Sequence, residues 1–385
     1  MYPLPKNLPV PTDIIFQSGS TKLLSNFIEK HRAKHILIFT GSSSLKKSGV
    51  LDKILSYISS VISAKVEIYD NFGRMLTTES VKHAVENYKN KKIDLVIAIG
   101  GGTVLDGAKC FSLLINNYGN LEDYLKGNKL PSKKSLPTIY IPTTCGTSSE
   151  ITSWATVWDI KNKRKYSLSH PFMYPEVAII DPELMLTLPK EQTALTGMDA
   201  LCHAIEAYWS KNANQISDKF AIEAIKLIME YLPQCYEDPQ NLEKRTKLAY
   251  GVLCSGLAFS QTKTTICHAL SYPLTIHHNV PHGQAVSVFL PIFLIANYKL
   301  AENNKTKEKF EFLIKELNCK NIGELSSKII ILMNNVKLHS TLKHLNLKNS
   351  DLKNIISEGL TYDRAANNPK NFSNDELMLM LNSLI

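Results

Sequence analysis

The chain lacks the features that would place it in a membrane or in a disulfide-rich secreted class. No apolar run approaches the ~18–20 residues that a membrane span needs, so we expect no membrane partner. The first residues, MYPLPKNLPVPTD, do not follow the pattern of a signal peptide. The 7 cysteines form no CxxC pair, which argues against both a disulfide framework and a thiolate zinc site. A reducing, cytoplasmic location fits this composition best.

The chain also lacks a nucleic-acid-binding motif, although its formal net charge is +9 at pH 7. Its lysines are spread along the sequence, and no basic stripe is interleaved with aromatic residues. We interpret the excess charge as a solvated basic surface and expect no nucleic-acid partner. Part of the charge could still serve an anionic substrate or cofactor.

What the sequence does contain is a change of pattern about half-way along its 385 residues, a length that suits two domains. The first half alternates amphipathic stretches with strand-like runs at 35–41, 65–70, 94–102, 136–144 and 175–184. Such alternation predicts a Rossmann-like parallel sheet covered by helices, whereas 151–170 predicts a β-hairpin. Helical periodicity dominates after about Pro182. The sequence therefore predicts an α/β domain over 1–185 and an all-α domain over 186–385.

The segment AIGGGTVLDGAK (98–109) predicts a buried strand that runs through glycines into a helix beginning near Thr103. The glycines are Gly100, Gly101 and Gly102. Consecutive glycines let the backbone approach a pyrophosphate, and the helix N-terminus offers N–H groups and a positive dipole end. Asp106 lies near the first turn, close enough to bond the ligand or a loop amide. The alternative is a tight turn without a ligand, because the pattern is not GxGxxG.

A second loop of the same kind follows in IPTTCGTSSEITS (141–153), where a strand ends in small hydroxyl residues. These residues are Thr143, Thr144, Thr147, Ser148 and Ser149. Their side chains could hold phosphate oxygens or a nicotinamide amide by hydrogen bonds. Taken alone, a segment of this composition is more often an ordinary loop.

A third pattern concerns metal ligands. Asp199 and His203 are spaced i, i+4, so both project from one face of a predicted helix, with Glu206 one turn further on. This pair could bind a divalent ion or form an ordinary surface pair. The segment 265–291 adds four histidines, which are His268, His277, His278 and His282. A site of oxygen and nitrogen ligands that would suit Fe²⁺, Zn²⁺, Mn²⁺ or Co²⁺ could be formed by Asp199, His203, His268 and His282.

In this order and at these spacings, the motifs resemble those of the iron-activated (group III) alcohol dehydrogenase family over essentially the whole chain. GGGTVLDGAK resembles the family's GGGSxxDxAK cofactor loop, and PTTCGTSSEIT resembles its PTTxGTGSEvT loop. TGMDALCHAIEAY is similar to the family's metal-ligand helix, and HALSYPLTIHHNVPHG to its HAxxHPLGxxxxxPHG stretch.

The resemblance implies a metal-dependent, NAD(P)H-linked alcohol dehydrogenase or aldehyde reductase that acts on a small-molecule substrate. It implies that the α/β domain binds NADPH or NADH through the two loops. It also implies that the helical domain binds one divalent metal, Fe²⁺ or Zn²⁺, and that the protein is a homodimer. The metal ligands implied in this chain are Asp199, His203, His268 and His282.

Tyr272 stands where the family usually has a second histidine, four residues after His268. In relatives that histidine lies near the reacting carbonyl rather than in the metal shell, so metal binding should survive its replacement. The route of the proton then falls to Tyr272, to His278 or to bound water.

The loop after the strand at 35–41 departs from the family in another way. Many relatives have an aspartate there that bonds the adenosine ribose, whereas this chain has Gly41. Polar and basic residues follow it, namely Ser42, Ser43, Ser44, Lys46 and Lys47. The loop resembles that of NADPH-preferring members, because these groups could accept a 2′-phosphate. The alternative is a helix N-cap with solvated lysines.

Lys263 lies five residues before His268, where relatives commonly have small apolar or glycine residues. Further cations in the predicted hairpin are Lys163, Arg164 and Lys165. The combination of KYSL with HALSYPLT resembles the phosphonoacetaldehyde reductase branch, which forms 2-hydroxyethylphosphonate. A phosphonate carries about two negative charges, so Lys263 would be a plausible anchor.

Other functions remain open from the sequence. A general short-chain aldehyde or alcohol oxidoreductase would leave these cations on the surface. A lyase similar to 3-dehydroquinate synthase would use the nicotinamide only transiently. A metallohydrolase without a nucleotide would leave the glycine loop and Thr143–Thr144 unexplained.

Overall fold

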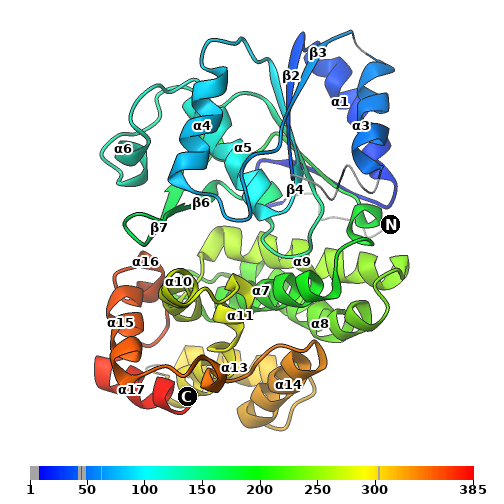
Figure 1. Ribbon diagram of the computed structural model, residues 1–385. Helices are drawn as coiled ribbons and strands as arrows, with labels where there is room; N and C mark the ends of the chain where they lie inside the picture. The colour runs from blue at the N-terminus through cyan, green and yellow to red at the C-terminus, as the bar shows by residue number, and fades with distance from the viewer. Residues whose placement is uncertain (1–7, 42–44, 46–48, 62, 302–303) are drawn as a thin grey trace. The chain divides into compact units, whose positions relative to one another are not determined.

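Six parallel strands form the sheet of the first part of the chain in the computed structural model, which describes residues 8–41, 45, 49–61, 63–301 and 304–385. The strand order is β1-β8-β5-β4-β2-β3, and every pair of neighbours is parallel (Figure 1). The strands are β1 (Asp13–Phe16), β2 (His35–Thr40), β3 (Lys65–Tyr69), β4 (Leu95–Gly100), β5 (Thr138–Pro142) and β8 (Val177–Ile180). The predicted parallel sheet is confirmed. Strand β1, a four-residue edge strand that follows a proline-rich start, was not predicted.

Alternate residues of each central strand enter two different cores, one on each face of the sheet. Along β2, Ile36 and Ile38 belong to one core, and Leu37 and Phe39 belong to the other. Figure 1 shows α1 and α3 on one side of the sheet and α4 and α5 on the other. These helices are α1 (Leu24–His31), α3 (Val50–Ser59), α4 (Thr78–Tyr88) and α5 (Gly102–Leu114), with the short α6 (Leu121–Leu125) after them. Because both faces are covered, the strands appear in the sequence as continuous apolar runs.

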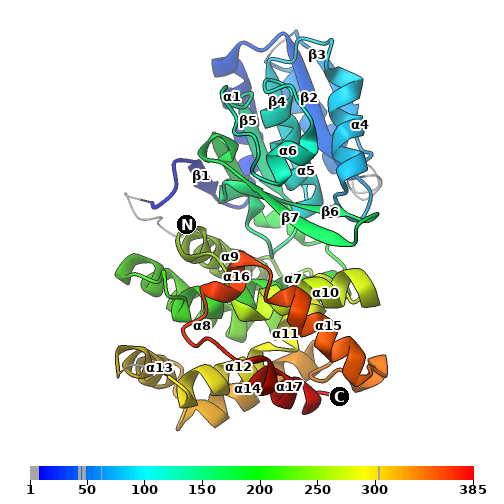
Figure 2. The same cartoon turned by 90° about the vertical axis from the view of Figure 1, so that its left-hand side faces the viewer.

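The predicted hairpin is also present and is separate from the main sheet. It consists of β6 (Trp154–Asp159) and β7 (Arg164–Ser169), which pair antiparallel (Figure 2). Short 3-10 turns connect the remaining segments, at η1 (Ser20–Leu23), η2 (Ser149–Ile151), η3 (Pro171–Met173) and η4 (Pro182–Met185).

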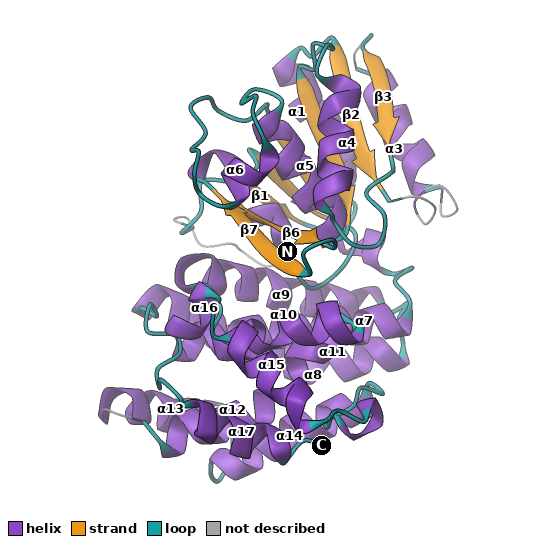
Figure 3. Ribbon diagram, turned by 60° about the vertical axis from the view of Figure 1, so that its left-hand side comes forward, coloured by secondary structure: helices purple, strands orange, loops and turns teal. Residues whose placement is uncertain are grey.

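The chain divides into two compact units, Met1–Leu188 and Pro189–Ile385. In the described part of the second unit all regular elements are helical, as Figure 3 shows in purple, which confirms the all-α prediction. The long helices α7 (Lys190–Trp209), α8 (Gln215–Glu237) and α9 (Leu242–Thr262) pack against one another. Among the described residues, no helix has both the length and the apolar character that a membrane span requires.

The shorter helices of the second unit follow in sequence. They are α10 (Ile266–His278), α11 (His282–Ser287), α12 (Leu290–Lys299), α13 (Asn304–Glu316), α14 (Ile322–Asn335), η5 (Lys343–Leu345), α15 (Asn349–Gly359), α16 (Asp363–Ala366) and α17 (Asn374–Asn382). Helix α11 packs against α7 at Gly283, where a side chain would place its Cβ only 2.1 Å from the carbonyl oxygen of Leu195. Only glycine permits this approach, because the obstructing atom belongs to a helix backbone.

We predict that Gly283→Ala destabilises the second unit by at least about 3 kcal/mol, the upper part of the range for overpacking a close contact. Thermal unfolding followed by far-UV circular dichroism measures the loss. Gly323→Ala on α14 is the matched control, since its Cβ would meet only the side chain of Asn321, at 3.1 Å. Equal melting temperatures for the two variants would contradict the packing argument.

Candidate functional site

The two loops predicted to bind a dinucleotide lie side by side at the carboxyl ends of β4 and β5. Gly100 pairs with Pro142, and the Thr143 N–H donates to the Gly100 carbonyl at 3.0 Å. Helix α5 begins at the last of the three glycines, Gly102, and its N-cap residue, Gly101, supplies no side-chain cap. An uncapped helix N-terminus at the carboxyl edge of a parallel sheet suits a phosphate group.

The glycines are also required by the second loop itself. A Cβ at Gly101 would lie 3.1 Å from Thr144 Cγ2, and one at Gly102 would lie 2.7 Å from Thr147 Cγ2. The structure therefore brings the predicted glycines and threonines into contact. The close packing of the loops explains part of the glycine pattern that the sequence analysis ascribed to a ligand.

Asp106 fastens these loops together. One of its carboxylate oxygens accepts from the Ser149 hydroxyl, and the other accepts from the Thr156 N–H at 2.7 Å. One turn further along α5, the buried Lys109 donates to Thr152 Oγ1 at 2.9 Å and to the Trp154 carbonyl at 2.8 Å. This role of Lys109 was not predicted, although the lysine is part of the glycine motif. Thr103 donates its hydroxyl to the Arg74 carbonyl at 3.2 Å.

Gly41 follows the last residue of β2, Thr40, which pairs with Ile99 of β4. Gly41 is therefore at the same edge of the sheet as the glycine loop. The predicted phosphate-binding residues Ser42 and Ser43 lie outside the described residues.

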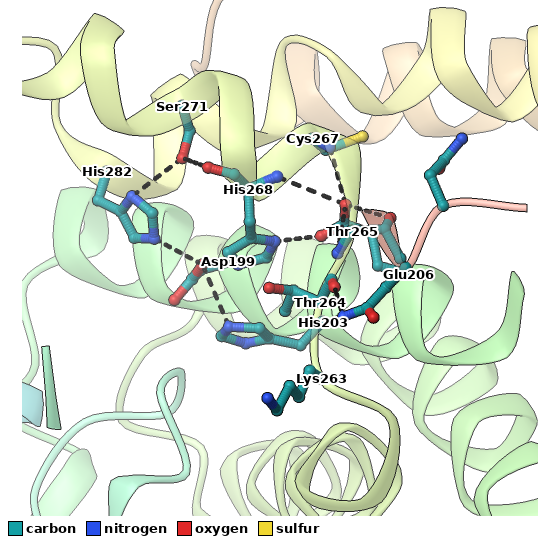
Figure 4. A network of polar contacts seen from close by, with 12 residues as sticks. Asp199, His203, Glu206, Lys263, Thr264, Thr265, Cys267, His268, Ser271 and His282 are labelled. Carbon is teal, nitrogen blue, oxygen red and sulfur yellow. Dashed lines mark hydrogen bonds and ion pairs between the residues drawn. The ribbon is translucent and has the colours of Figure 1, made fainter. Parts of the chain in front are cut away.

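In the second unit, the four predicted metal ligands come together from three helices. Helix α7 contributes Asp199 and His203, α10 contributes His268, and α11 contributes His282 (Figure 4). One oxygen, Asp199 Oδ1, is the common centre: the Nε2 atoms of His268, His282 and His203 lie 3.5, 3.7 and 3.9 Å from it. One atom each from Asp199, His268 and His282 fits within a span of 4.8 Å.

These atoms fit a divalent cation. Asp199 Oδ1 and His268 Nε2 are buried without a hydrogen-bond partner among the residues that the structure describes. Buried polar atoms are rarely left unsatisfied, and a cation among them would satisfy both. The donor set of one carboxylate and imidazoles suits Fe²⁺ or Zn²⁺ and lacks the thiolates that select softer metals.

The electrostatics at two members of the cluster, His203 and Asp199, favour the protonation states of metal ligands. Burial lowers the pKa of His203 to about 3, so its ring is neutral at pH 7. Burial alone would raise the pKa of Asp199, but the surrounding imidazoles, with His203 foremost, hold that pKa below its usual range. The His203 ring is stacked between Phe259, at 4.2 Å between centroids, and His268, at 4.5 Å, which fixes its plane.

Glu206 orients His268 from the side away from Asp199. Its Oε2 is bonded to His268 Nδ1, and its Oε1 accepts from the Thr265 hydroxyl at 2.6 Å and from the Cys267 N–H at 2.8 Å. An ionised carboxylate only accepts, so Nδ1 carries the proton and Nε2 presents a lone pair towards Asp199. Burial would lower the pKa of His268, but the Glu206 carboxylate raises it and makes the ring a more basic ligand. Glu206 was predicted one turn after His203 on the same helix, but this role was not predicted.

Of the two residues predicted for the proton route, the structure brings only Tyr272 to the cluster. Its buried ring stacks on that of His282, with centroids 5.9 Å apart and an interplanar angle of 13°. Burial raises the pKa of the Tyr272 phenol well above its usual range. His278 ends α10 and lines a separate cavity of about 460 Å³ with Tyr236, His339 and other residues. Among the described residues, His278 makes no hydrogen bond or ring contact with the four predicted ligands.

Lys263 caps α9 and begins the segment that leads to His268. Its backbone has φ 60° and ψ 178°, a conformation that is nearly restricted to glycine and costs a side-chain-bearing residue about 1–3 kcal/mol. Its Nζ lies 3.6 Å from Asp363 Oδ2, and about half of its side chain is exposed. The hairpin cations Lys163 and Arg164 are exposed and belong to the other unit.

Comparison with known proteins gives matches along nearly the whole chain. The model of the iron-containing alcohol dehydrogenases matches residues 11–182, and that of the C-terminal part of the Fe-containing alcohol dehydrogenase family matches 193–385. An NADPH-dependent butanol dehydrogenase of Clostridium saccharobutylicum is 30% identical over 383 residues, with 96% of this chain and 95% of that protein covered. A sulfoacetaldehyde reductase of Bilophila wadsworthia is 29% identical, with 96% of each protein covered.

A similar structure is known as well. The crystal structure of a sulfoacetaldehyde reductase from Bifidobacterium kashiwanohense in complex with NAD⁺ superposes with a TM-score of 0.90. It is 29% identical in sequence, and 99% of both chains is covered.

A buried glutamate in the second loop predicts a pH-dependent stability. Burial raises the pKa of Glu150 from 4.5 to about 7, so between these values the folded chain binds a proton that the unfolded chain releases. The stabilising contribution is therefore full below about pH 4.5 and is lost as the pH rises through 7. As the pH rises from 5 to 7.5, the free energy of unfolding of Glu150→Gln, measured with urea, should increase relative to that of the wild type by at most about 3 kcal/mol. For Glu79→Gln, which changes an exposed glutamate, the free energy of unfolding relative to that of the wild type should not change with pH. Equal pH profiles for the two variants would contradict this prediction.

Glu206→Gln should weaken metal binding by about 10–100-fold, the usual effect of losing the partner of a ligand histidine. The amide oxygen can still accept from Thr265 and Cys267, but the amide nitrogen is a donor and cannot accept a hydrogen bond from His268 Nδ1. The ring proton then moves to Nε2, whose lone pair is no longer available to the metal. Titration of Zn²⁺ against a competing chelator measures the affinity. Glu191→Gln, an exposed change on the same helix, should bind Zn²⁺ like the wild type. An unchanged affinity in Glu206→Gln would refute the orienting role.

Proposed function

The chain belongs to the iron-containing alcohol dehydrogenase family, and we propose that it reduces a short aldehyde that carries an anionic group, with NADPH as hydride donor. As a family member, it is a metal-dependent, NAD(P)-linked oxidoreductase of the alcohol dehydrogenase type. The observation that carries the proposal is the convergence of three imidazole nitrogens on one buried carboxylate oxygen. A carbonyl oxygen is the group that such a centre would activate.

The residues proposed to hold one Fe²⁺ or Zn²⁺ ion are Asp199, His203, His268 and His282. When bound, such an ion supplies a Lewis acid for a carbonyl oxygen, and the reduced nicotinamide supplies the hydride. One carboxylate among neutral imidazoles leaves the centre with a net positive charge, which that role requires. Glu206 keeps the proton on His268 Nδ1. Tyr272 shields one face of His282 from water and, with its pKa raised by burial, keeps its own hydroxyl proton at neutral pH.

Two features support an anionic aldehyde such as phosphonoacetaldehyde or sulfoacetaldehyde, both of which carry a tetrahedral oxyanion. Lys263 brings a positive charge to the segment that carries His268, in a backbone conformation that glycine would adopt at less cost. Two similar proteins are sulfoacetaldehyde reductases. The general short-chain aldehyde reductase remains the alternative if the anion is not recognised.

We propose that the dinucleotide lies on the uncapped N-terminus of α5, beside the loop that contains Thr144 and Thr147. The preference for NADPH is supported by Gly41, because no carboxylate at this position would repel a 2′-phosphate. It is also supported by the similarity to the butanol dehydrogenase, which is NADPH-dependent. A homodimer and a cytoplasmic location stay predictions.

The first experiment follows the absorbance of the reduced nicotinamide with purified protein loaded with Fe²⁺ or Zn²⁺. Phosphonoacetaldehyde and sulfoacetaldehyde are compared with 3,3-dimethylbutanal, which has a neutral tert-butyl group in place of the oxyanion. We expect kcat/KM to be at least about tenfold higher for the anionic aldehydes, a difference of about 1.4 kcal/mol. NADPH should be preferred over NADH, and His268→Ala should abolish turnover.

Lys263→Met should lower the preference for the anionic aldehydes about tenfold. Lys315→Met, which removes an exposed lysine from α13, is the matched control and should leave the preference intact. Equal rates with 3,3-dimethylbutanal in the wild type would discard the anionic substrate. No turnover of any aldehyde by metal-loaded protein would contradict the reductase itself.

A further inference from the structure

Helices α15 and α16 pack on α10, the helix that carries His268 and Tyr272. The N-cap residue of α16, Tyr362, meets the Tyr272 ring edge-on, with centroids 4.9 Å apart and an interplanar angle of 75°. Asn367, directly after α16, donates its side-chain N–H to the Thr264 carbonyl at 3.1 Å. Helix α16 is therefore attached both to α10 and to the segment that precedes it.

His282 is the most exposed of the four proposed metal ligands. Its side chain is 33% exposed, against 8% or less for those of Asp199, His203 and His268. Its Nδ1 lies 3.5 Å from Ser271 Oγ, which is longer than a usual N–H···O hydrogen bond. Because the Ser271 hydroxyl donates to the His268 carbonyl at 2.7 Å, its oxygen accepts from His282 Nδ1. This long polar contact orients the His282 ring only weakly.

Aromatic stacking restrains the plane of the His282 ring more firmly. The Tyr272 ring lies nearly parallel to it, at an interplanar angle of 13° and with centroids 5.9 Å apart. Tyr272 is buried, and Tyr362 packs edge-on against the same ring. Stacked and edge-on pairs at these separations are both favourable arrangements. The contacts of these three rings therefore connect α16, through α10, to the ligand that begins α11.

We infer that Tyr362 is a positioning residue for the proposed metal centre and acts through Tyr272 on the ring of His282. With the Tyr362 ring in place, Tyr272 is held against His282, whose Nε2 stays 3.7 Å from Asp199 Oδ1. Without that ring, Tyr272 is free to tilt and His282 gains rotamers that point its Nε2 elsewhere. The ion would then have to order the His282 side chain as it binds, which lowers the affinity.

This inference rests on the proposed function, and the experiment separates the two. The affinity for Zn²⁺ is measured by competition with a chelator in wild type, Tyr362→Ala and Tyr362→Phe. We expect the affinity to fall about tenfold in Tyr362→Ala, the lower end of the range for loss of a group that orients a metal ligand. Tyr362→Phe keeps the ring and should bind Zn²⁺ like the wild type. Tyr362→Leu keeps the apolar bulk without the ring, should also lose affinity, and replaces Tyr362→Ala if that variant does not fold.

Tyr298→Ala is the matched control in the same unit. The Tyr298 ring meets that of Phe310 edge-on, with centroids 6.0 Å apart and an interplanar angle of 76°. The control therefore loses an aromatic pair of similar geometry, and within the described part of the chain this pair has no ring contact with the four ligands. It should bind Zn²⁺ like the wild type, even if its melting temperature falls as far as that of Tyr362→Ala.

A double-mutant cycle tests whether the effect passes through His282. In a His282→Ala background, Tyr362→Ala should have almost no further effect on Zn²⁺ affinity, whereas a general loosening of the unit would lower the affinity by the same factor in both backgrounds. If that factor is the same, or if Tyr362→Ala alone binds Zn²⁺ as tightly as the wild type, the positioning role is refuted while the metal centre stands. If His282→Ala alone binds Zn²⁺ like the wild type, the proposed centre is refuted, and the inference with it.

Discussion

The contact between the Glu206 carboxylate and the beginning of α10 fixes the arrangement of the candidate site. One oxygen of this buried carboxylate accepts from the Thr265 hydroxyl and the Cys267 N–H at the N-terminus of α10, and the other holds the proton on His268. The same helix, α7, carries Asp199 and His203, so a single rigid element sets both the centre of the cluster and the direction from which His268 approaches. The close approach of α11 at Gly283 then brings His282 to the same point. The geometry of the cluster therefore depends on helix packing and very little on loops.

Much of this architecture could be predicted from the sequence because its signals are local. The parallel sheet followed from apolar runs alternating with amphipathic stretches, and the helical second unit from sustained periodicity. The i, i+4 spacing of Asp199 and His203 put both on one helix face. Their convergence with His268 and His282 was predicted from the chemistry of the four side chains and from the family resemblance. These residues do come together in the structure, whereas the assignment of His278 to the proton route has no contact that supports it.

What could not be predicted depends on partners that are distant in the sequence. Glu206 lies 62 residues from His268, and nothing near it marks it as the group that orients that ring. Lys109 and Asp106 appear in the sequence as parts of a phosphate-binding motif, but their donors and acceptors show that they also fasten one loop to the next. Strand β1 is four residues long and lies at the edge of the sheet, so it offers too little pattern to recognise.

If Lys263 binds the anionic group of the substrate as proposed, its backbone sets stability against specificity at one position. Because φ 60° with ψ 178° is cheap only for glycine, a glycine there would relieve about 1–3 kcal/mol of backbone strain, which exceeds the roughly 0.5–1 kcal/mol that the greater freedom of glycine costs on folding. Selection for heat resistance alone would therefore move this position towards glycine and remove the charge from the segment that leads to His268. Related enzymes that differ at this one site would be expected to divide into more robust catalysts with neutral substrates and less robust ones with charged substrates. An engineer seeking a general aldehyde reductase from this scaffold would gain stability and lose selectivity through the same substitution.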